Sequence, residues 1–145
     1  MKKIGVIGAG TWGIALARML ANSNHSVIVW SALEKEIEEL SATRKHPNLP
    51  EMEIPENLEF TKNIQEACEG KDILLMAVPS VFVRSTAAQM RPFVQDGQVI
   101  VDVAKGIEPS TLYTMTEVIK DELNKDGEHA NIKLVALSGP PFVNI

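Results

Sequence analysis

The stretch KKIGVIGAGTWGIALARML, residues 2–20, decides the fold that this sequence predicts. An apolar run over residues 3–7 is typical of a buried strand, and an Ala- and Leu-rich helical pattern follows Gly8, Gly10 and Gly13. The spacing GxGxxG between a strand and a helix is typical of a turn that binds a dinucleotide pyrophosphate. Such a turn needs Gly8 for a tight bend, Gly10 for close approach of backbone to phosphate, and Gly13 for close helix–strand packing. A glycine-rich turn that serves only packing is the alternative interpretation.

Strand-like and helix-like patterns alternate along the chain. The expected strands are 3–7, 26–30, 58–61, 72–79, 98–103 and 132–139, and the expected helices are 11–23, 34–43, 63–70, 81–93 and 110–125. Ser110, directly after Pro109, is the expected N-cap of the last helix. Residues 46–57 hold three prolines and no period, which predicts a loop. The alternation predicts an α/β fold over residues 1–145: a Rossmann-type doubly wound, mostly parallel sheet with helices on both faces.

Composition excludes several functional classes. The 14 basic residues are scattered and the net charge is −5, which disfavours nucleic acid or an anionic membrane as a partner. No apolar stretch approaches the roughly 20 residues of a spanning helix, and the N-terminus lacks a signal-peptide pattern, so we expect no membrane insertion and a cytoplasmic location. Cys68 is the single cysteine and is expected to pack on a helix face. The three histidines lack ligand spacing, so we expect no metal site.

Two side chains fill the variable positions of the glycine turn. Thr11 offers a hydroxyl and an amide to a phosphate. Trp12 is large for such a turn, and it either forms a wall of the cofactor cleft or packs under the next loop.

The end of the second strand leaves the choice of cofactor open. An acid is expected there, about 20 residues beyond the glycines, to bind the adenosine ribose. This chain has Trp30-Ser31-Ala32-Leu33 instead, and Glu34 falls on the next helix. No Arg stands there for a 2′-phosphate either, and Ser31 is able to bond NAD or NADP.

Ligands in open α/β sheets bind outside the carboxyl ends of the strands. Three further ends carry the segments VPSVF (78–82), VAKGIEPS (103–110) and SGPP (138–141). Pro79 ends a strand beside the expected nicotinamide, and Phe82 either lines the cleft or belongs to the core. Lys105 is a candidate cation for a phosphate or a polarised carbonyl, with a solvated loop lysine as the alternative. Asp102 receives no role from this pattern.

Together these segments resemble the soluble, NAD(P)-dependent glycerol-3-phosphate dehydrogenase family. The matching pieces, in the family's order, are GAGTWGIALA (8–17), VIVW (27–30), NLPEMEIPENL (48–58), AVPSVF (77–82), AKGIEP (104–109) and LSGP (137–140). The first piece is shared by many dinucleotide enzymes. KGIEP followed by SGP is much more specific.

The resemblance implies reversible hydride transfer between NAD(P)H and dihydroxyacetone phosphate, which gives sn-glycerol 3-phosphate for phospholipid synthesis. It also implies site residues by position: Gly8, Gly10, Thr11, Trp12 and Gly13 at the cofactor phosphates, Pro79 and Phe82 beside the nicotinamide, Lys105 on both substrate and cofactor, and Gly139 with backbone toward the substrate.

The sequence departs from the family pattern in three places. Ala32 and Leu33 stand where the family often has a basic residue, and Pro141 stands where Ser, Thr or Asn usually begins a further helix. The family's second, helical domain supplies the acid/base lysine, phosphate ligands and dimer contacts, and no part of this chain corresponds to it. We therefore expect no catalytic residue in this chain, weak dinucleotide binding, background turnover, and a homodimer only in the longer form.

Two other interpretations are weighed against this one. The domain is alternatively the cofactor domain of a related dehydrogenase of the 3-hydroxyacyl-CoA or 6-phosphogluconate type, which KGIEP with LSGP disfavours. A stand-alone, non-catalytic dinucleotide-sensing module is the third interpretation, and the well-formed loop at Lys105 disfavours it.

Overall fold

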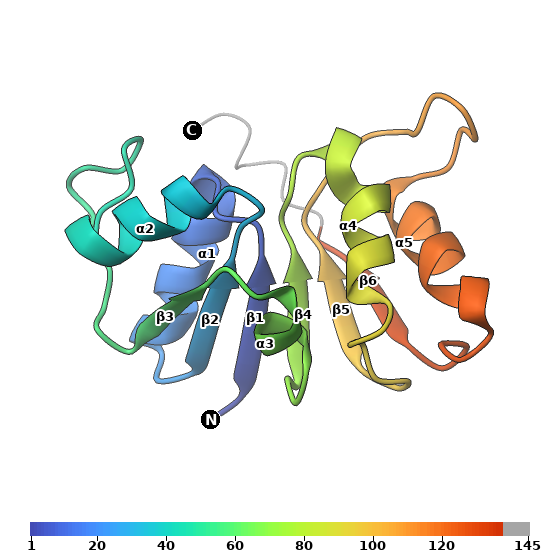
Figure 1. The fold of residues 1–145 in the computed structure, drawn as a ribbon, viewed down its shortest axis with the longest axis horizontal. Helices are drawn as coiled ribbons and strands as arrows, with labels where there is room; N and C mark the ends of the chain where they lie inside the picture. The colour runs from blue at the N-terminus through green and yellow to red at the C-terminus, as the bar shows by residue number, and fades with distance from the viewer. Residues whose placement is uncertain (138–145) are drawn as a thin grey trace.

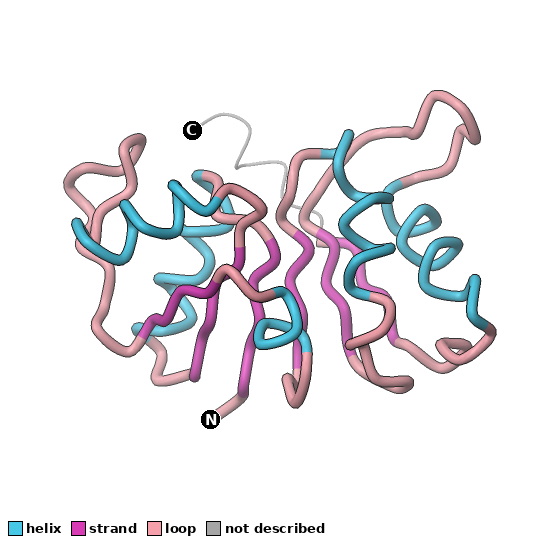
Figure 2. Tube along the Cα trace, in the orientation of Figure 1, coloured by secondary structure: helices cyan, strands magenta, loops and turns pink. Residues whose placement is uncertain are grey.

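The computed structural model describes residues 1–137, in which six strands form one sheet in the order β3-β2-β1-β4-β5-β6, with every neighbouring pair parallel (Figures 1 and 2). The elements are β1 (Lys3–Ile7), α1 (Thr11–Asn22), β2 (Ser26–Trp30), α2 (Glu34–Thr43), β3 (Leu58–Thr61), α3 (Ile64–Cys68), β4 (Ile73–Met76), η1 (Ser80–Phe82), α4 (Val83–Met90), β5 (Val99–Asp102), α5 (Met115–Leu123), η2 (Asn124–Asp126) and β6 (Lys133–Ala136). This strand order confirms the predicted Rossmann-type doubly wound sheet.

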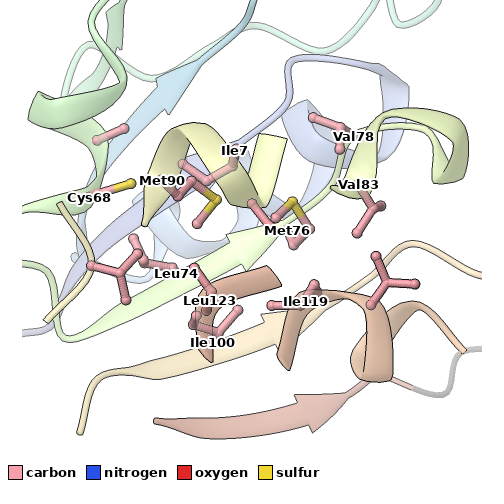
Figure 3. Close-up of a cluster of buried hydrophobic side chains, with 14 of the residues drawn as sticks. Ile7, Cys68, Leu74, Met76, Val78, Val83, Met90, Ile100, Ile119 and Leu123 are labelled. Atoms are coloured by element: carbon pink, nitrogen blue, oxygen red, sulfur yellow. The ribbon is translucent and has the colours of Figure 1, made fainter. Parts of the chain in front are cut away.

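Helices cover the sheet on both faces. One buried cluster joins α1 and α2 to the sheet, with Ile14 and Leu40 among its fully buried side chains. The other joins α3, α4 and α5 to the opposite face, and Figure 3 shows Met76, Met90 and Ile119 within it. β1 is buried on both faces after its first residue, as its unbroken apolar run predicts.

The last long helix begins later than predicted. α5 starts at Met115, and its N-cap is Thr114, so Ser110 as N-cap is wrong. Thr114 Oγ1 accepts from Glu117 N and the Glu117 carboxylate accepts from Thr114 N, which completes a capping box. Leu112 adopts φ +62°, a left-handed conformation that interrupts any helix running on from residue 110.

The helix predicted over 81–93 is divided. A 3₁₀ turn, η1, precedes α4, which ends at Met90 because Pro92 has no N–H with which to continue the ladder. Cys68 is buried at the end of α3, which confirms its predicted packing, and burial raises the pKa of its thiol to about 12. No helix within residues 1–137 combines the length and apolar character that crossing a membrane requires.

Candidate functional site

The candidate site lies at the carboxyl ends of β1, β4 and β5, where the strand order reverses direction (Figure 1). A pocket of about 460 Å³ opens there, with lining from all three strand ends. Its lining residues are Gly10, Thr11, Trp12, Ala77, Val78, Pro79, Ser80, Val103, Ala104, Lys105 and Leu137. Five residues singled out in the sequence, Gly10, Thr11, Trp12, Pro79 and Lys105, are therefore brought together around one space.

The three glycines of the turn are needed for different reasons. At Gly8, φ is +122° and a Cβ would lie 2.7 Å from the carbonyl carbon of Ala77, so both conformation and space require glycine. At Gly13, a Cβ would lie 2.3 Å from Gly8 O, so the first turn of α1 packs directly on the turn that precedes it. At Gly10 no heavy atom lies within 4 Å of the Cβ position, although the residue lines the pocket. The open space beside Gly10 fits a bound group such as a phosphate.

The start of α1 is suited to an anion. Gly10 is the N-cap and brings no side chain to bond the first amides of the helix, which have no intrahelical acceptors. The first turn of α1 contains no acidic residue, so the positive end of the helix dipole is not neutralised there. Thr11 Oγ1 accepts from Asn48 Nδ2 at 3.0 Å, which brings the loop over residues 46–57 to the edge of the site.

Lys105 enters the pocket from a loop that is held from outside. Gly106 next to it adopts φ +130°, and the atoms nearest its Cβ position belong to Ser80, at 3.7 Å. Two nitrogens of Arg84 donate to the two oxygens of Glu108, each at 2.8 Å, and Arg84 also bonds α5 through Asp121 at 2.8 Å. The Arg84 guanidinium, helped by the Thr111 hydroxyl, lowers the pKa of Glu108 to about 2. The loop after β5 is therefore tied to α4 and α5 by charged groups.

Among the described residues, four predicted site residues do not line this pocket: Gly8 and Gly13, which build the turn beside it, and Ser31 and Phe82. Phe82 is 56% exposed at the end of η1, so it neither packs in the core nor lines the pocket. Ser31 is buried, and its Oγ donates to Glu36 Oε1 at 2.7 Å and accepts from Leu33 N at 3.1 Å. Gly139 lies outside the described residues.

Sequence reasoning missed two contributors to the site. Ser80 lines the pocket, and its position directly after Pro79 at a strand end was an available signal. Asn48 lies 37 residues from its partner Thr11, and no local pattern reveals that contact. Asp102, which receives no role from the sequence, does not line the pocket; it ends β5 with 4% exposure and with its Oδ1 unpartnered, and burial raises the pKa of its carboxyl to about 6. Within residues 1–137, no group of three or more His, Cys, Asp or Glu side chains is placed to hold a metal.

Comparisons with known proteins give a consistent result. The family model for the NAD-dependent glycerol-3-phosphate dehydrogenase N-terminus matches residues 3–144. The chain is 67% identical over 140 residues to glycerol-3-phosphate dehydrogenase [NAD(P)+] 2 of Lactobacillus delbrueckii subsp. bulgaricus, a match that covers 97% of this chain and 42% of the relative. It is 51% identical over 124 residues to the glycerol-3-phosphate dehydrogenase [NAD(P)+] of Agathobacter rectalis, which covers 85% of this chain and 37% of that one.

Solved structures resemble the fold. Glycerol-3-phosphate dehydrogenase of Coxiella burnetii superposes with a TM-score of 0.79 at 20% identity, covering 94% of this chain and 54% of that chain. The Plasmodium falciparum enzyme gives a TM-score of 0.77 at 20% identity, covering 95% of this chain and 40% of that chain. At this identity the structures support the fold alone. Compared with the two curated relatives of the preceding paragraph, the chain spans 37% to 42% of their length.

Proposed function

This chain belongs to the NAD-dependent glycerol-3-phosphate dehydrogenase family, and we propose from that premise that residues 1–145 form one dinucleotide-binding domain, which takes NAD or NADP. The observation that carries the proposal is the pocket that joins Gly10, Pro79 and Lys105 at the switch point of the sheet. The apolar residues that line most of this pocket suit a flat ring, and the open space beside Gly10 suits the pyrophosphate to which the ring is attached.

The pyrophosphate lies at the start of α1 in this proposal. Amides at the helix start bind its oxygens, and Gly10 leaves the space that they occupy. Trp12 and Pro79 both line the pocket, where they exclude water from the bound nicotinamide. When bound, the reduced nicotinamide supplies the hydride for the reaction.

The proposed substrate pair is dihydroxyacetone phosphate and sn-glycerol 3-phosphate, for glycerophospholipid synthesis in the cytoplasm. Lys105 is the one ionisable side chain among the described residues that line the pocket, and its ammonium binds the substrate phosphate or the carbonyl oxygen. Reduction of the carbonyl also needs a proton on its oxygen, and a positioned acid contributes about 10²–10⁴-fold. We assign that acid, and the homodimer contacts, to the family's second, helical domain.

Intrinsic fluorescence tests the cofactor part of the proposal. Trp12 is 38% exposed and lines the pocket, whereas Trp30 is buried and its Nε1 donates to Lys62 O at 3.3 Å. We expect NADH to quench emission in the native chain and in Trp30→Phe, and most of the quenching to disappear in Trp12→Phe. Equal quenching in the two variants would remove Trp12 from the site, and absence of NADH binding by calorimetry would refute the proposal.

A second titration tests the substrate part. With NAD bound, we expect sn-glycerol 3-phosphate to bind the native chain and to lose its affinity in Lys105→Met. Lys133→Met is the matched control, because Lys133 begins β6 at the opposite, amino end of the sheet and is exposed. Equal loss in both variants would show a general charge effect and would contradict a role for Lys105. Oxidation of NADH with dihydroxyacetone phosphate by this chain alone should stay at the background rate.

A further inference from the structure

The end of β2 carries a serine where dinucleotide-binding folds commonly carry an acid. β2 lies beside β1, and Gly8 N donates to Trp30 O at 2.8 Å. Residue 31, which follows Trp30, therefore lies next to the glycine turn. An acid at this place, about 20 residues beyond the glycines, ordinarily binds the ribose 2′-hydroxyl of NAD. Ser31 has no charge with which to do so. The nearest carboxylate in the structure comes instead from the helix that follows.

Ser31 holds the carboxylate of Glu36 at the strand end. Its Oγ donates to Glu36 Oε1 at 2.7 Å, while its own oxygen accepts from Leu33 N at 3.1 Å. Ser31 is only 6% exposed, so this contact is shielded from competing water. Glu36 is the third residue of α2, where the helix dipole favours a negative charge. The carboxylate of Glu36 is therefore one hydrogen bond away from residue 31, the position at which such folds usually carry an acid.

The carboxylate of Glu36 remains reachable. The side chain is only partly buried and lines a pocket of about 710 Å³ between α2 and the loop over residues 45–50. That pocket is also lined by Asn48, which donates to Thr11 of the glycine turn at 3.0 Å. The surface at Glu36 thus adjoins the place where the pyrophosphate is proposed to lie.

The charged side chains around Glu36 do not add up to a net positive site for a 2′-phosphate. Ala32 and Leu33 follow Ser31, so the residues that leave β2 supply no cation. Lys62, from the next strand's end, is paired with Glu38 at 2.6 Å. Lys35 and Lys45 line the same pocket as Glu36, and Glu39 adds a second negative charge, so the two cations there are balanced by two carboxylates.

We propose that Glu36, positioned by Ser31, selects NAD over NADP: its carboxylate accepts a hydrogen bond from the ribose 2′-hydroxyl and repels a 2′-phosphate. This inference rests on the proposed function, since it concerns the same bound dinucleotide. It assigns the missing acid of the fingerprint to a residue on α2 rather than on β2.

Paired titrations of NADH and NADPH test the assignment. The native chain is compared at low salt with Glu36→Gln and with Glu39→Gln, which removes the same charge from the same helix and pocket one turn farther on. We expect the native chain to bind NADH more tightly, and the NADH-over-NADPH affinity ratio to fall about tenfold in Glu36→Gln and to change little in Glu39→Gln. Circular dichroism confirms that each variant is folded.

Further outcomes separate the inference from its premise. Ser31→Ala keeps the charge of Glu36 but removes its anchor, so the ratio should fall by a smaller factor. Tighter binding of NADPH by the native chain, as a phosphate site at Lys35 and Lys45 would give, overturns the inference. An equal change of the affinity ratio in Glu36→Gln and Glu39→Gln also overturns it. Each of those results leaves the proposed function standing. Failure of both dinucleotides to bind the native chain overturns the proposed function and the inference with it.

Discussion

Replacement of Gly13 by alanine tests whether the glycine turn is built by packing. The added Cβ would lie 2.3 Å from Gly8 O, closer than real Cβ contacts. Gly8 has no room to retreat, because its own Cβ direction faces the Ala77 carbonyl carbon at 2.7 Å. Overpacking of this kind costs about 1–3 kcal/mol or more, and the gain of about 1 kcal/mol from alanine in a helix offsets part of it. Because the added Cβ meets a backbone oxygen rather than a flexible side chain, the upper end of that cost applies, and we expect a net loss of about 2 kcal/mol, or about 4–8 °C in Tm for a domain of this size.

Gly10→Ala is the matched substitution with the opposite expectation. No atom lies within 4 Å of its Cβ position, and φ −70° with ψ −177° is open to alanine. Loss of a favourable N-cap costs about 0.5–1 kcal/mol, and the stiffer unfolded chain returns about 0.4–1 kcal/mol. The Tm should therefore change by no more than about 2–3 °C. The methyl group nevertheless occupies the space proposed for phosphate, so the NADH affinity should fall at least about tenfold.

Thermal melts followed by circular dichroism, together with NADH titrations, distinguish the two effects. The expected pattern is a melting temperature that falls in Gly13→Ala alone and an affinity that falls in Gly10→Ala with the fold retained. A Gly13→Ala variant as stable as the native chain would refute the packing argument. Wild-type NADH affinity in Gly10→Ala would refute the placement of the pyrophosphate.

Three further predictions concern titratable groups. Arg84 lowers the pKa of Glu108 to about 2, so the contribution of Glu108 to stability is present above its unfolded pKa near 4.5 and is lost as pH falls toward 2. Between these pH values, the Tm of Glu108→Gln should therefore fall less steeply with falling pH than the Tm of the native chain. Burial lowers the pKa of His129, but hydrogen bonds to Val94 O and Asp126 outweigh it and raise the pKa above 6.5. The contribution of His129 to stability is therefore complete below the unfolded pKa and is lost as pH rises through the folded pKa. Between pH 5.5 and 8.5 the Tm of the native chain should decline for this reason, and the Tm of His129→Gln should lack that decline. Cys68 should resist iodoacetamide until urea unfolds the chain, because burial raises its pKa to about 12; labelling of the folded protein at the unfolded rate would contradict this.

Local patterns predicted the order and type of the elements because each buried strand reads as an apolar run and each helix as an amphipathic period. The predicted start of the last helix at Ser110 is wrong although the signal for its true start, Thr114 with Glu117 three residues on, is present in the sequence. Ser110 and Thr114 are competing caps, and the left-handed Leu112 decides between them only in three dimensions. Contacts across the chain, such as Asn48 with Thr11, have no local signature at all.

The KGIEP segment combines a residue that lines the pocket with residues that only hold it in place. Lys105 lines the pocket, Gly106 supplies the φ of +130° that turns the chain beside Ser80, and Glu108 binds Arg84 on the side toward α4 and α5. Only the first of these residues lines the pocket. The other two fix where Lys105 stands, and they do so through different forces, backbone conformation and a bidentate ion pair. The glycine turn follows the same division, since Gly8 and Gly13 close the packing while Gly10 leaves the space. In both segments, some residues line the pocket and others only fix its shape, so the sequence pattern identifies the place of the site more completely than it identifies the chemistry.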